Sequence, residues 1–142
     1  MILSNNSIQK YVDKGEIVIT PFNRDHLKAA SYTLTLGECL YFIDNNGNKV
    51  SKNISSEPHL LKPNEFILGE TEEHIRFNGK FAGILSTRGS CAQRGIHVLL
   101  GSIFIEPDTD NKIILEIVNE SSKPVELTCG MKIVKCVFMK VT

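Results

Sequence analysis

The sequence has no surplus of either charge. Among its 142 residues, 16 Lys and Arg balance 16 Asp and Glu, so the formal net charge at pH 7 is zero. A protein that binds nucleic acid through the phosphate backbone needs local positive charge. The balance therefore argues against a general polyanion binder, and we expect no nucleic-acid partner. A small, local phosphate site is still compatible with this composition.

Long hydrophobic runs are also missing. No stretch of the sequence approaches the length that is needed to cross a bilayer. The opening Met1-Ile2-Leu3 is too short to form the apolar core of a signal peptide. We therefore expect no membrane association and a cytoplasmic location.

The usual signatures of metal and nucleophile chemistry are absent. The four cysteines form no Cys-x-x-Cys pair, and the histidine–glutamate and cysteine pattern of zinc deaminases is missing. No Ser-His-Asp or Cys-His arrangement has a usable local spacing, and there is no Gly-x-Gly-x-x-Gly or Walker sequence. We predict free, buried thiols and no metal ion bound by protein side chains.

What the sequence does contain is a series of short β-rich segments separated by turn residues. One short helix precedes them, capped by Ser4, with Ile8, Tyr11 and Val12 on one face and Gly15 at its end. Many short strands with little helix favour an all-β sandwich or barrel, in one domain that spans residues 1–142. The predicted strands are 16–20, 32–36, 39–43, 66–71, 75–77, 81–85, 96–104, 113–118, 125–128 and 133–141. The polar regions 44–57 and 53–62 are predicted to be surface loops, and the Asn-Gly pair within residues 44–48 indicates a hairpin turn or a short loop there.

Residues 86–95, Ser-Thr-Arg-Gly-Ser-Cys-Ala-Gln-Arg-Gly, form the most informative stretch. Two apolar runs flank it, and it combines two arginines, three hydroxyls and two glycines. Hydroxyls and backbone N–H groups donate to anions, and an arginine adds a charged, forked donor. If residues 90–94 form a helical turn, its N-terminus adds a positive dipole end. The stretch is either a cradle for phosphate or a polar loop between two strands.

Two carboxylates attract attention beyond this cradle. Glu116 interrupts the apolar segment 113–118, and charged residues are rarely buried without a partner or a role. If it faces a pocket, burial would raise its pKa and suit it for proton transfer. Strand alternation offers another interpretation, in which Glu116 points away from the core. Glu106 precedes a proline at a turn and is either functional or merely solvated.

Taken in order, these segments resemble the dCTP deaminase and dUTPase superfamily, and the deaminase branch more closely. The resemblance covers nearly the whole chain and depends on the order and spacing of its motifs. The motifs are Met1-Ile2-Leu3-Ser4 with residues 8–11 and 15–17, Ser-Tyr-Thr-Leu-Thr-Leu-Gly at 31–37, residues 61–69, the cradle, Ile-Glu-Pro at 105–107, Ile-Ile-Leu-Glu at 113–116, and residues 130–138.

The resemblance implies a distorted β-barrel of jelly-roll type, assembled as a homotrimer with sites between subunits. It also implies zinc-free, hydrolytic deamination of dCTP to dUTP in pyrimidine deoxynucleotide metabolism. In that chemistry a glutamate activates water for attack on C4 of cytosine, and Mg²⁺ binds through the triphosphate. The catalytic carboxylates would be Glu116, as general base, and Glu106. The nucleotide and phosphate contacts would be Arg88, Gly89, Ser90, Gln93, Arg94, Lys132 and Lys135.

The sequence also departs from the family pattern. Thr33 replaces the aspartate of the first motif, Gln93 stands where the second cradle arginine is expected, and Lys135 replaces a glutamine of the last motif. Extra residues lie between His97 and Phe104, where the family shapes its base pocket. The sequence ends at Thr142, soon after the last predicted strand, whereas family members continue into a tail that closes over the nucleotide.

Three hypotheses follow. The first is a dCTP deaminase, favoured by Glu116 together with Arg88 and Ser90. The second is a dUTP diphosphatase, in which Glu106 would hold the attacking water. The third is a non-catalytic nucleotide-binding or regulatory module on the same fold, favoured by the departures from the family pattern. The expected ligand is deoxycytidine or deoxyuridine triphosphate.

Overall fold

The computed structural model describes residues 1–98 and 102–142. Three helical segments occur in this part of the chain, α1 (Asn5–Asp13), the short 3₁₀ turn η1 (Arg24–His26) and α2 (Gly89–Gln93). The strands are β1 (Val18–Thr20), β2 (Leu27–Lys28), β3 (Ser31–Ile43), β4 (Lys49–Asn53), β5 (His59–Leu61), β6 (Phe66–Arg76), β7 (Phe81–Thr87), β8 (Ile96–Val98), β9 (Phe104–Ile105), β10 (Asp110–Asn119), β11 (Val125–Leu127) and β12 (Lys132–Lys140).

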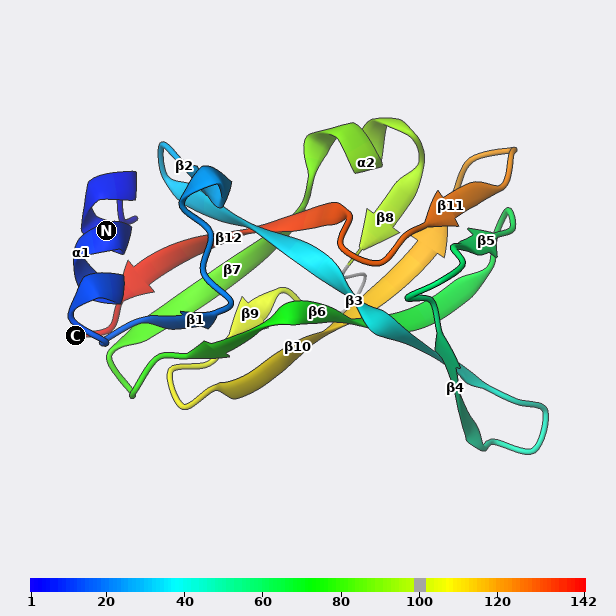
Figure 1. The fold of residues 1–142 in the computed structure, drawn as a ribbon, viewed down its shortest axis with the longest axis horizontal. Helices are drawn as coiled ribbons and strands as arrows, with labels where there is room; N and C mark the ends of the chain where they lie inside the picture. Colours follow the sequence, from blue (N-terminus) through cyan, green and yellow to red (C-terminus); the bar gives the residue numbers. More distant parts are fainter. Residues whose placement is uncertain (99–101) are drawn as a thin grey trace.

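Most of the strands belong to one antiparallel sheet. Its strands follow the order β8-β10-β6-β3-β12-β7-β9, with β1, β2 and β4 attached at its margins, and β11 pairs with β5 separately. The sheet twists and curls into a half-barrel, with β3 crossing the middle of the view in Figure 1. The predicted all-β, distorted-barrel architecture is confirmed.

The N-terminal helix forms as the sequence predicts. The Ser4 side chain accepts a hydrogen bond from the Ser7 N–H at 3.2 Å, which caps α1. Ile8, on the inner face of this helix, is fully buried. Gly15, with φ of 71°, follows the cap in the left-handed conformation that ends many helices. Both chain ends lie at this end of the molecule (Figure 1), where Ile2 bridges to Met139 of β12.

The two strands predicted at 32–36 and 39–43 are one strand, β3. Its pairing with β6 shifts register between Leu36 and Leu40, so the chain bulges but does not turn. Gly37 makes this possible, because a Cβ there would lie 3.1 Å from the Glu70 carbonyl oxygen. The predicted strands 66–71 and 75–77 are likewise one strand, β6.

The prediction of loops at 44–57 and 53–62 is wrong in part. β4 pairs with β3 in a hairpin, whose turn is held by hydrogen bonds from the Asn46 and Asn48 N–H groups to the Asp44 carboxylate. Every residue of β4 is exposed, so neither face needs apolar side chains and no alternation marks the strand. β5 also lies within the predicted loop. Residues 99–101 of the predicted strand 96–104 lie outside the described residues, and its ends form β8 and β9.

None of the helices in the described part of the chain is long and apolar enough to cross a membrane. The four cysteines are free, as predicted; Cys91 and Cys136 are buried, whereas Cys39 and Cys129 are partly exposed.

Candidate functional site

The cradle, residues 86–95, is built on a turn between two strands. β7 ends at Thr87, the chain passes through Arg88 into the single helical turn α2, and Gly95 leads into β8. The predicted helical turn is thus present, one residue earlier than expected. In Figure 1 it projects from the sheet next to β8.

Backbone and side-chain contacts fix this turn to the sheet. The Thr87 hydroxyl binds both the N–H and the C=O of Val98, at 3.0 and 3.1 Å. The Arg88 N–H donates to the Ile133 carbonyl at 2.8 Å, and the buried Cys91 thiol donates to the Lys132 carbonyl at 3.4 Å. The cradle is therefore held between the ends of β8 and β12.

Gly95 closes the cradle at a position that accepts no larger residue. Its φ is 85°, and a Cβ there would lie 2.6 Å from the Ser121 Cβ. Its carbonyl accepts a hydrogen bond from the Glu120 N–H at 2.8 Å. Only glycine combines this backbone conformation with such a close approach.

The polar side chains of the cradle differ in how they are held. Arg88 donates from Nη1 to the Ser90 hydroxyl at 2.7 Å, so these two groups lie together over the first turn of α2. Gln93 and Arg94 are exposed at the far end of the turn. Lys132 and Lys135 are exposed on β12, and Lys135 pairs across the sheet with Ser86. The structure joins Arg88 to Ser90 by this hydrogen bond on either side of Gly89, whereas Gln93 and Arg94 stand at the C-terminal end of the same short helix.

Glu116 lies on the face of β10 opposite to its core residues. Leu115 and Ile117 are fully buried, while Glu116 is partly exposed, as the alternation predicts. This outward face nevertheless lines a cavity of about 370 Å³, together with residues of β6, β7 and β9. The Glu116 carboxylate accepts a hydrogen bond from the Ser102 N–H at 3.1 Å. It therefore faces a pocket, with at least one oxygen fixed.

The cavity is mixed in character. Apolar side chains form much of its wall, among them Leu68, Leu85 and Ile105, and polar groups from Asn111 and Lys112 lie at its margin. An apolar wall with a few convergent polar groups is typical of a small-molecule site.

The strand β8 links the segments that carry Glu116 and Arg88. Val98 pairs with Ile117, the neighbour of Glu116, and its backbone also binds the hydroxyl of Thr87, the neighbour of Arg88. Among the described residues, those that line the Glu116 cavity include none from the cradle.

Glu106 is placed differently. It is exposed, and its carbonyl accepts the turn hydrogen bond from the Thr109 N–H at 3.1 Å. The neighbouring Ile105 lines the cavity, whereas Glu106 is not among the residues that line it in the described chain. The structure shows the turn that was predicted and does not bring this carboxylate into the Glu116 cavity.

The order of motifs agrees with a comparison against protein families. The family model described as dCTP deaminase-like matches residues 2–141. The chain belongs to the dCTP deaminase-like family. The match takes in the cradle, the Glu116 strand and the last strand together, and so confirms the family resemblance of the motifs.

Similar proteins carry the name dCTP deaminase, dUMP-forming. The protein of Hydrogenobaculum sp. is 27% identical over 147 residues, which cover 99% of this chain and 82% of the relative. The protein of Methanosphaera stadtmanae is 29% identical over 157 residues, covering 99% of this chain and 80% of the relative.

Solved structures share the fold at lower identity. The 2′-deoxycytidine 5′-triphosphate deaminase from Agrobacterium tumefaciens superposes with a TM-score of 0.78 at 15% identity, over 99% of this chain and 48% of its own. This chain thus spans about half the length of that protein. The dUTPase of phage phi11 of S. aureus superposes with a TM-score of 0.62 at 12% identity, over 89% and 91% of the two chains. The fold is the dUTPase type.

Sequence reasoning missed one further polar cluster in this dCTP deaminase-like chain. Glu73 on β6 is 2% exposed, and its carboxylate accepts hydrogen bonds from the Thr35 N–H and hydroxyl at 2.9 and 2.8 Å. Burial raises the pKa of Glu73, against the lowering effect of these hydrogen bonds. The signal in the sequence is weak, because Glu73 stands in the polar run Glu-Thr-Glu-Glu-His and its partner lies on another strand.

Protein side chains do not form a metal cage in the described part of the chain. No group of three or more His, Cys, Asp or Glu residues among residues 1–98 and 102–142 has the arrangement to hold a metal ion. Mg²⁺ commonly keeps its water and binds through substrate phosphates together with one or two carboxylates.

Proposed function

We propose that this protein is a dCTP deaminase in which Glu116 is the general base. The observation that carries the proposal is the placement of Glu116. The carboxylate lines a cavity in the curled sheet and accepts a hydrogen bond from the Ser102 N–H, and β8 links its strand to the segment that carries Arg88 and Ser90. A base must lie within reach of the proton that it moves, and a cavity beside a fixed carboxylate provides that place.

The reaction needs one water and one proton carrier. Glu116 takes a proton from water as the water oxygen attacks C4 of cytosine, and the exocyclic nitrogen leaves C4 as ammonia after it receives a proton. The net change is the exchange of an amino group for a carbonyl oxygen. The apolar side chains of the cavity wall lower the local polarity around the carboxylate, which strengthens its interactions with the substrate.

The cradle would bind the phosphates of the nucleotide. Arg88 and Ser90 are already joined by a hydrogen bond, so the guanidinium is held over the exposed end of the turn. Charge-assisted contacts of this kind are stronger than neutral hydrogen bonds. Lys132 and Lys135 add positive charge from β12, and Gly89 lets the backbone approach the ligand. Mg²⁺ bound through the triphosphate would neutralise part of its charge; the dUTPase of phage phi11, which shares the fold, coordinates a structural Mg(II) ion.

A homotrimer with sites between subunits completes the proposal. The Glu116 cavity is open at one side, and Phe104 and Ile114 beside it are 47% and 50% exposed. Such apolar side chains at the rim suit contact with a second subunit. Light scattering at micromolar concentration should give three times the monomer mass, and a monomeric mass would contradict the assembly.

The product is the open point within this activity. The family resemblance implies dUTP, whereas the similar proteins are named dUMP-forming, which requires cleavage of the α–β phosphate bond as well. We favour deamination as the first reaction, with Glu106 reserved for a diphosphatase role.

The test is to incubate the pure protein with dCTP and with dUTP, each with Mg²⁺, and to assay ammonia and pyrophosphate. Ammonia without pyrophosphate indicates a dCTP deaminase that stops at dUTP, and both products together indicate the dUMP-forming reaction. Pyrophosphate from dUTP alone would replace the proposal with a dUTP diphosphatase. Nucleotide binding without either product would leave a binding module.

A further inference from the structure

The Thr35 hydroxyl lies between two carboxylates. Its Oγ1 is 2.8 Å from Glu73 Oε2 and 3.0 Å from Glu72 Oε2, and the Thr35 N–H donates to Glu73 Oε1 at 2.9 Å. Thr35 belongs to β3 and both glutamates belong to β6. The three side chains therefore join neighbouring strands next to the bulge at which the β3–β6 register shifts.

The two contacts of the Thr35 oxygen need two protons, and the hydroxyl supplies only one. A threonine hydroxyl has one proton, so it donates to one carboxylate only. If both carboxylates were ionised, the second contact would bring two oxygen lone pairs together at hydrogen-bond distance. One proton on a carboxyl group removes the conflict, because that carboxyl then donates to the Thr35 oxygen while the hydroxyl donates to the other carboxylate.

The proton belongs on Glu73. Its side chain is almost fully buried, and this burial raises its pKa above the ordinary value of 4.5, with the nearby Glu72 charge acting in the same direction. Glu72, by contrast, is exposed, so burial singles out Glu73 of the two carboxyl groups. The resulting chain of hydrogen bonds runs from Glu73 through Thr35 to Glu72.

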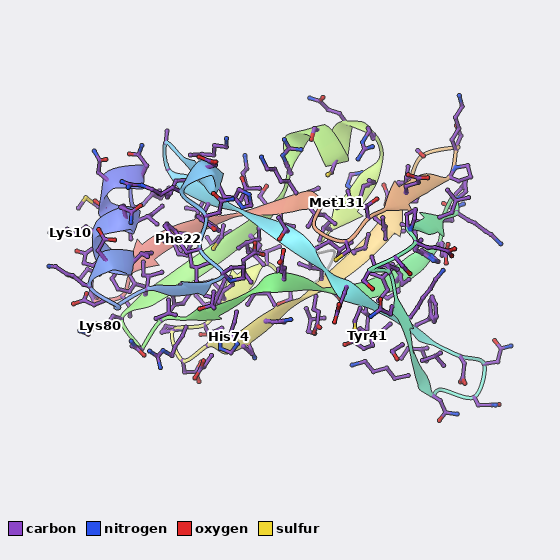
Figure 2. All side chains as sticks on the ribbon, viewed as in Figure 1. Lys10, Phe22, Tyr41, His74, Lys80 and Met131 are labelled. Carbon is purple, nitrogen blue, oxygen red and sulfur yellow. The ribbon has the colours of Figure 1, made fainter. Side chains whose placement is uncertain are left out.

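We propose that Glu73, Thr35 and Glu72 form a latch that holds one proton between β3 and β6, and that loss of this proton weakens the junction of the two strands. The latch is accessible to solvent protons. Glu72 and Glu73 line a cavity of about 590 Å³ whose opposite wall carries the stacked rings of Phe22 and Tyr32, 5.3 Å apart. Figure 2 labels Phe22, close to the start of β3.

Other titratable groups face the same region. Tyr32, whose pKa is raised mainly by burial and further by the charges of Glu73 and Glu72, lies on β3. Arg24 and His26 line the cavity from η1, and Lys132 of β12 pairs with Thr35 across the sheet. Glu72 also contributes to the raised pKa of Cys129, after burial.

The latch connects to the strand that carries Glu116. The Thr71 hydroxyl donates to the Glu73 carbonyl at 2.7 Å and accepts the Ile113 N–H at 3.0 Å. Ile113 sits where the β10–β6 register shifts, so its N–H finds a side-chain acceptor in place of a ladder partner. A change in the backbone at Glu73 therefore reaches the bulge that precedes the cavity.

The sign of the pH effect follows from the raised pKa of Glu73. The folded protein holds this proton more tightly than the unfolded chain does. The stabilising effect of the proton is therefore fully present at pH values below 4.5, the ordinary pKa of a glutamate. Stability falls as the pH rises from that value through the higher pKa of the folded state. Substitution by glutamine keeps an N–H donor in place of the carboxyl proton and should abolish this dependence.

Infrared spectroscopy of the folded protein tests the latch directly. The wild type should show a protonated-carboxyl stretch that persists at a pH where ordinary carboxyl groups are ionised. This band should vanish in Glu73→Gln, weaken in Glu72→Gln, where only one carboxylate remains beside the Thr35 hydroxyl, and stay unchanged in the control Glu57→Gln, whose side chain is exposed. A wild-type spectrum without the band, or a band that survives in Glu73→Gln, would overturn the proposal.

Denaturant unfolding across the same pH range gives the second readout. The wild type and Glu57→Gln should lose stability as the pH rises, whereas Glu73→Gln should show a flatter profile over that interval. Equal pH profiles in all three proteins would contradict the latch. Because the wild-type spectrum alone suffices to reject the proposal, it stays testable even if Glu73→Gln does not fold.

Discussion

Glu116 and Glu73 are carboxylates on the neighbouring strands β10 and β6, and they differ in how far they are exposed to solvent. Glu116 interrupts an apolar segment of the sequence but lies on the outward face, partly exposed and facing a cavity. Glu73 stands in a polar stretch of the sequence but is buried and bonded to Thr35. From their sequence neighbours alone, Glu116 would be expected to be buried and Glu73 exposed, and the fold reverses both.

The difference shows which role each environment allows a carboxylate to take. An accessible carboxylate beside a cavity can exchange protons with a bound substrate and with water, which is what a general base requires. A buried carboxyl with fixed partners holds its proton and links the strands that supply them. The surroundings of Glu116 fit the general-base role that we propose for it, and those of Glu73 fit a role in joining β3 and β6.

The largest effect is expected at the Glu116 cavity. Glu116→Gln keeps the shape of the side chain and removes its capacity to accept a proton, so deamination of dCTP should fall by about 10²–10⁴-fold. Binding of dCTP should survive, because the amide still forms hydrogen bonds. Ammonia release and calorimetry measure the two quantities. Glu57→Gln, at an exposed glutamate, is the control. An active Glu116→Gln would direct attention to Glu106.

The next largest effect is expected in the cradle, on nucleotide binding. Arg88→Ala should weaken nucleotide binding by about 1.5–3 kcal/mol, the range for a hydrogen bond to a charged group. Arg94→Ala should have a much smaller effect, because Arg94 lies at the exposed far end of α2, away from the Arg88–Ser90 pair. Calorimetric titration with dCTP measures both. Equal losses in the two variants would show that the cradle is wrongly assigned.

Changes at the contacts of Glu73 should alter the stability of the fold. Thr35→Val removes the hydroxyl that two carboxylates share, and should destabilise the fold by about 1–3 kcal/mol, the cost of leaving a buried polar group unsatisfied. Thr33→Val is the matched control, since both threonines are 4% exposed on the same strand. Denaturant unfolding should separate the two variants, and similar values for both would remove the special role of Thr35.

The smallest effect is expected at a third carboxylate, which is paired but exposed. His74 Nε2 lies 2.6 Å from Asp110, joining β6 to β10, with side chains 44% and 60% exposed; Figure 2 labels His74. His74→Gln should change the free energy of unfolding by less than about 1 kcal/mol, as is usual for exposed pairs. A loss as large as that of Thr35→Val would show that exposure does not separate these carboxylates.

Local sequence was sufficient for the parts of the fold that depend on local physics. The cap at Ser4 was predicted, and the helical turn after Arg88 and the outward direction of Glu116 were each among the alternatives that the sequence left open. Each of these features depends on residues a few positions apart. Strand alternation offered the outward direction of Glu116 as one of two interpretations, and only the curl of the sheet turns that outward face into a cavity wall.

Long-range pairing explains what the sequence left undecided. β4 has no apolar alternation because it is exposed throughout, and β3 continues through Gly37 because β6 approaches it there. Glu73 is buried only because Thr35, on another strand, supplies two donors. Predictions from neighbouring residues do not contain these contacts.

The most direct test of the central claim follows oxygen from water into the product. The wild-type protein is incubated with dCTP and Mg²⁺ in water labelled with heavy oxygen, and the nucleotide is examined by mass spectrometry. Hydrolytic deamination at the Glu116 cavity predicts label on the C4 carbonyl of a uracil base, with one ammonia released for each labelled base. A nucleotide that binds but keeps an unlabelled cytosine, or that carries label only on phosphate, would contradict the account.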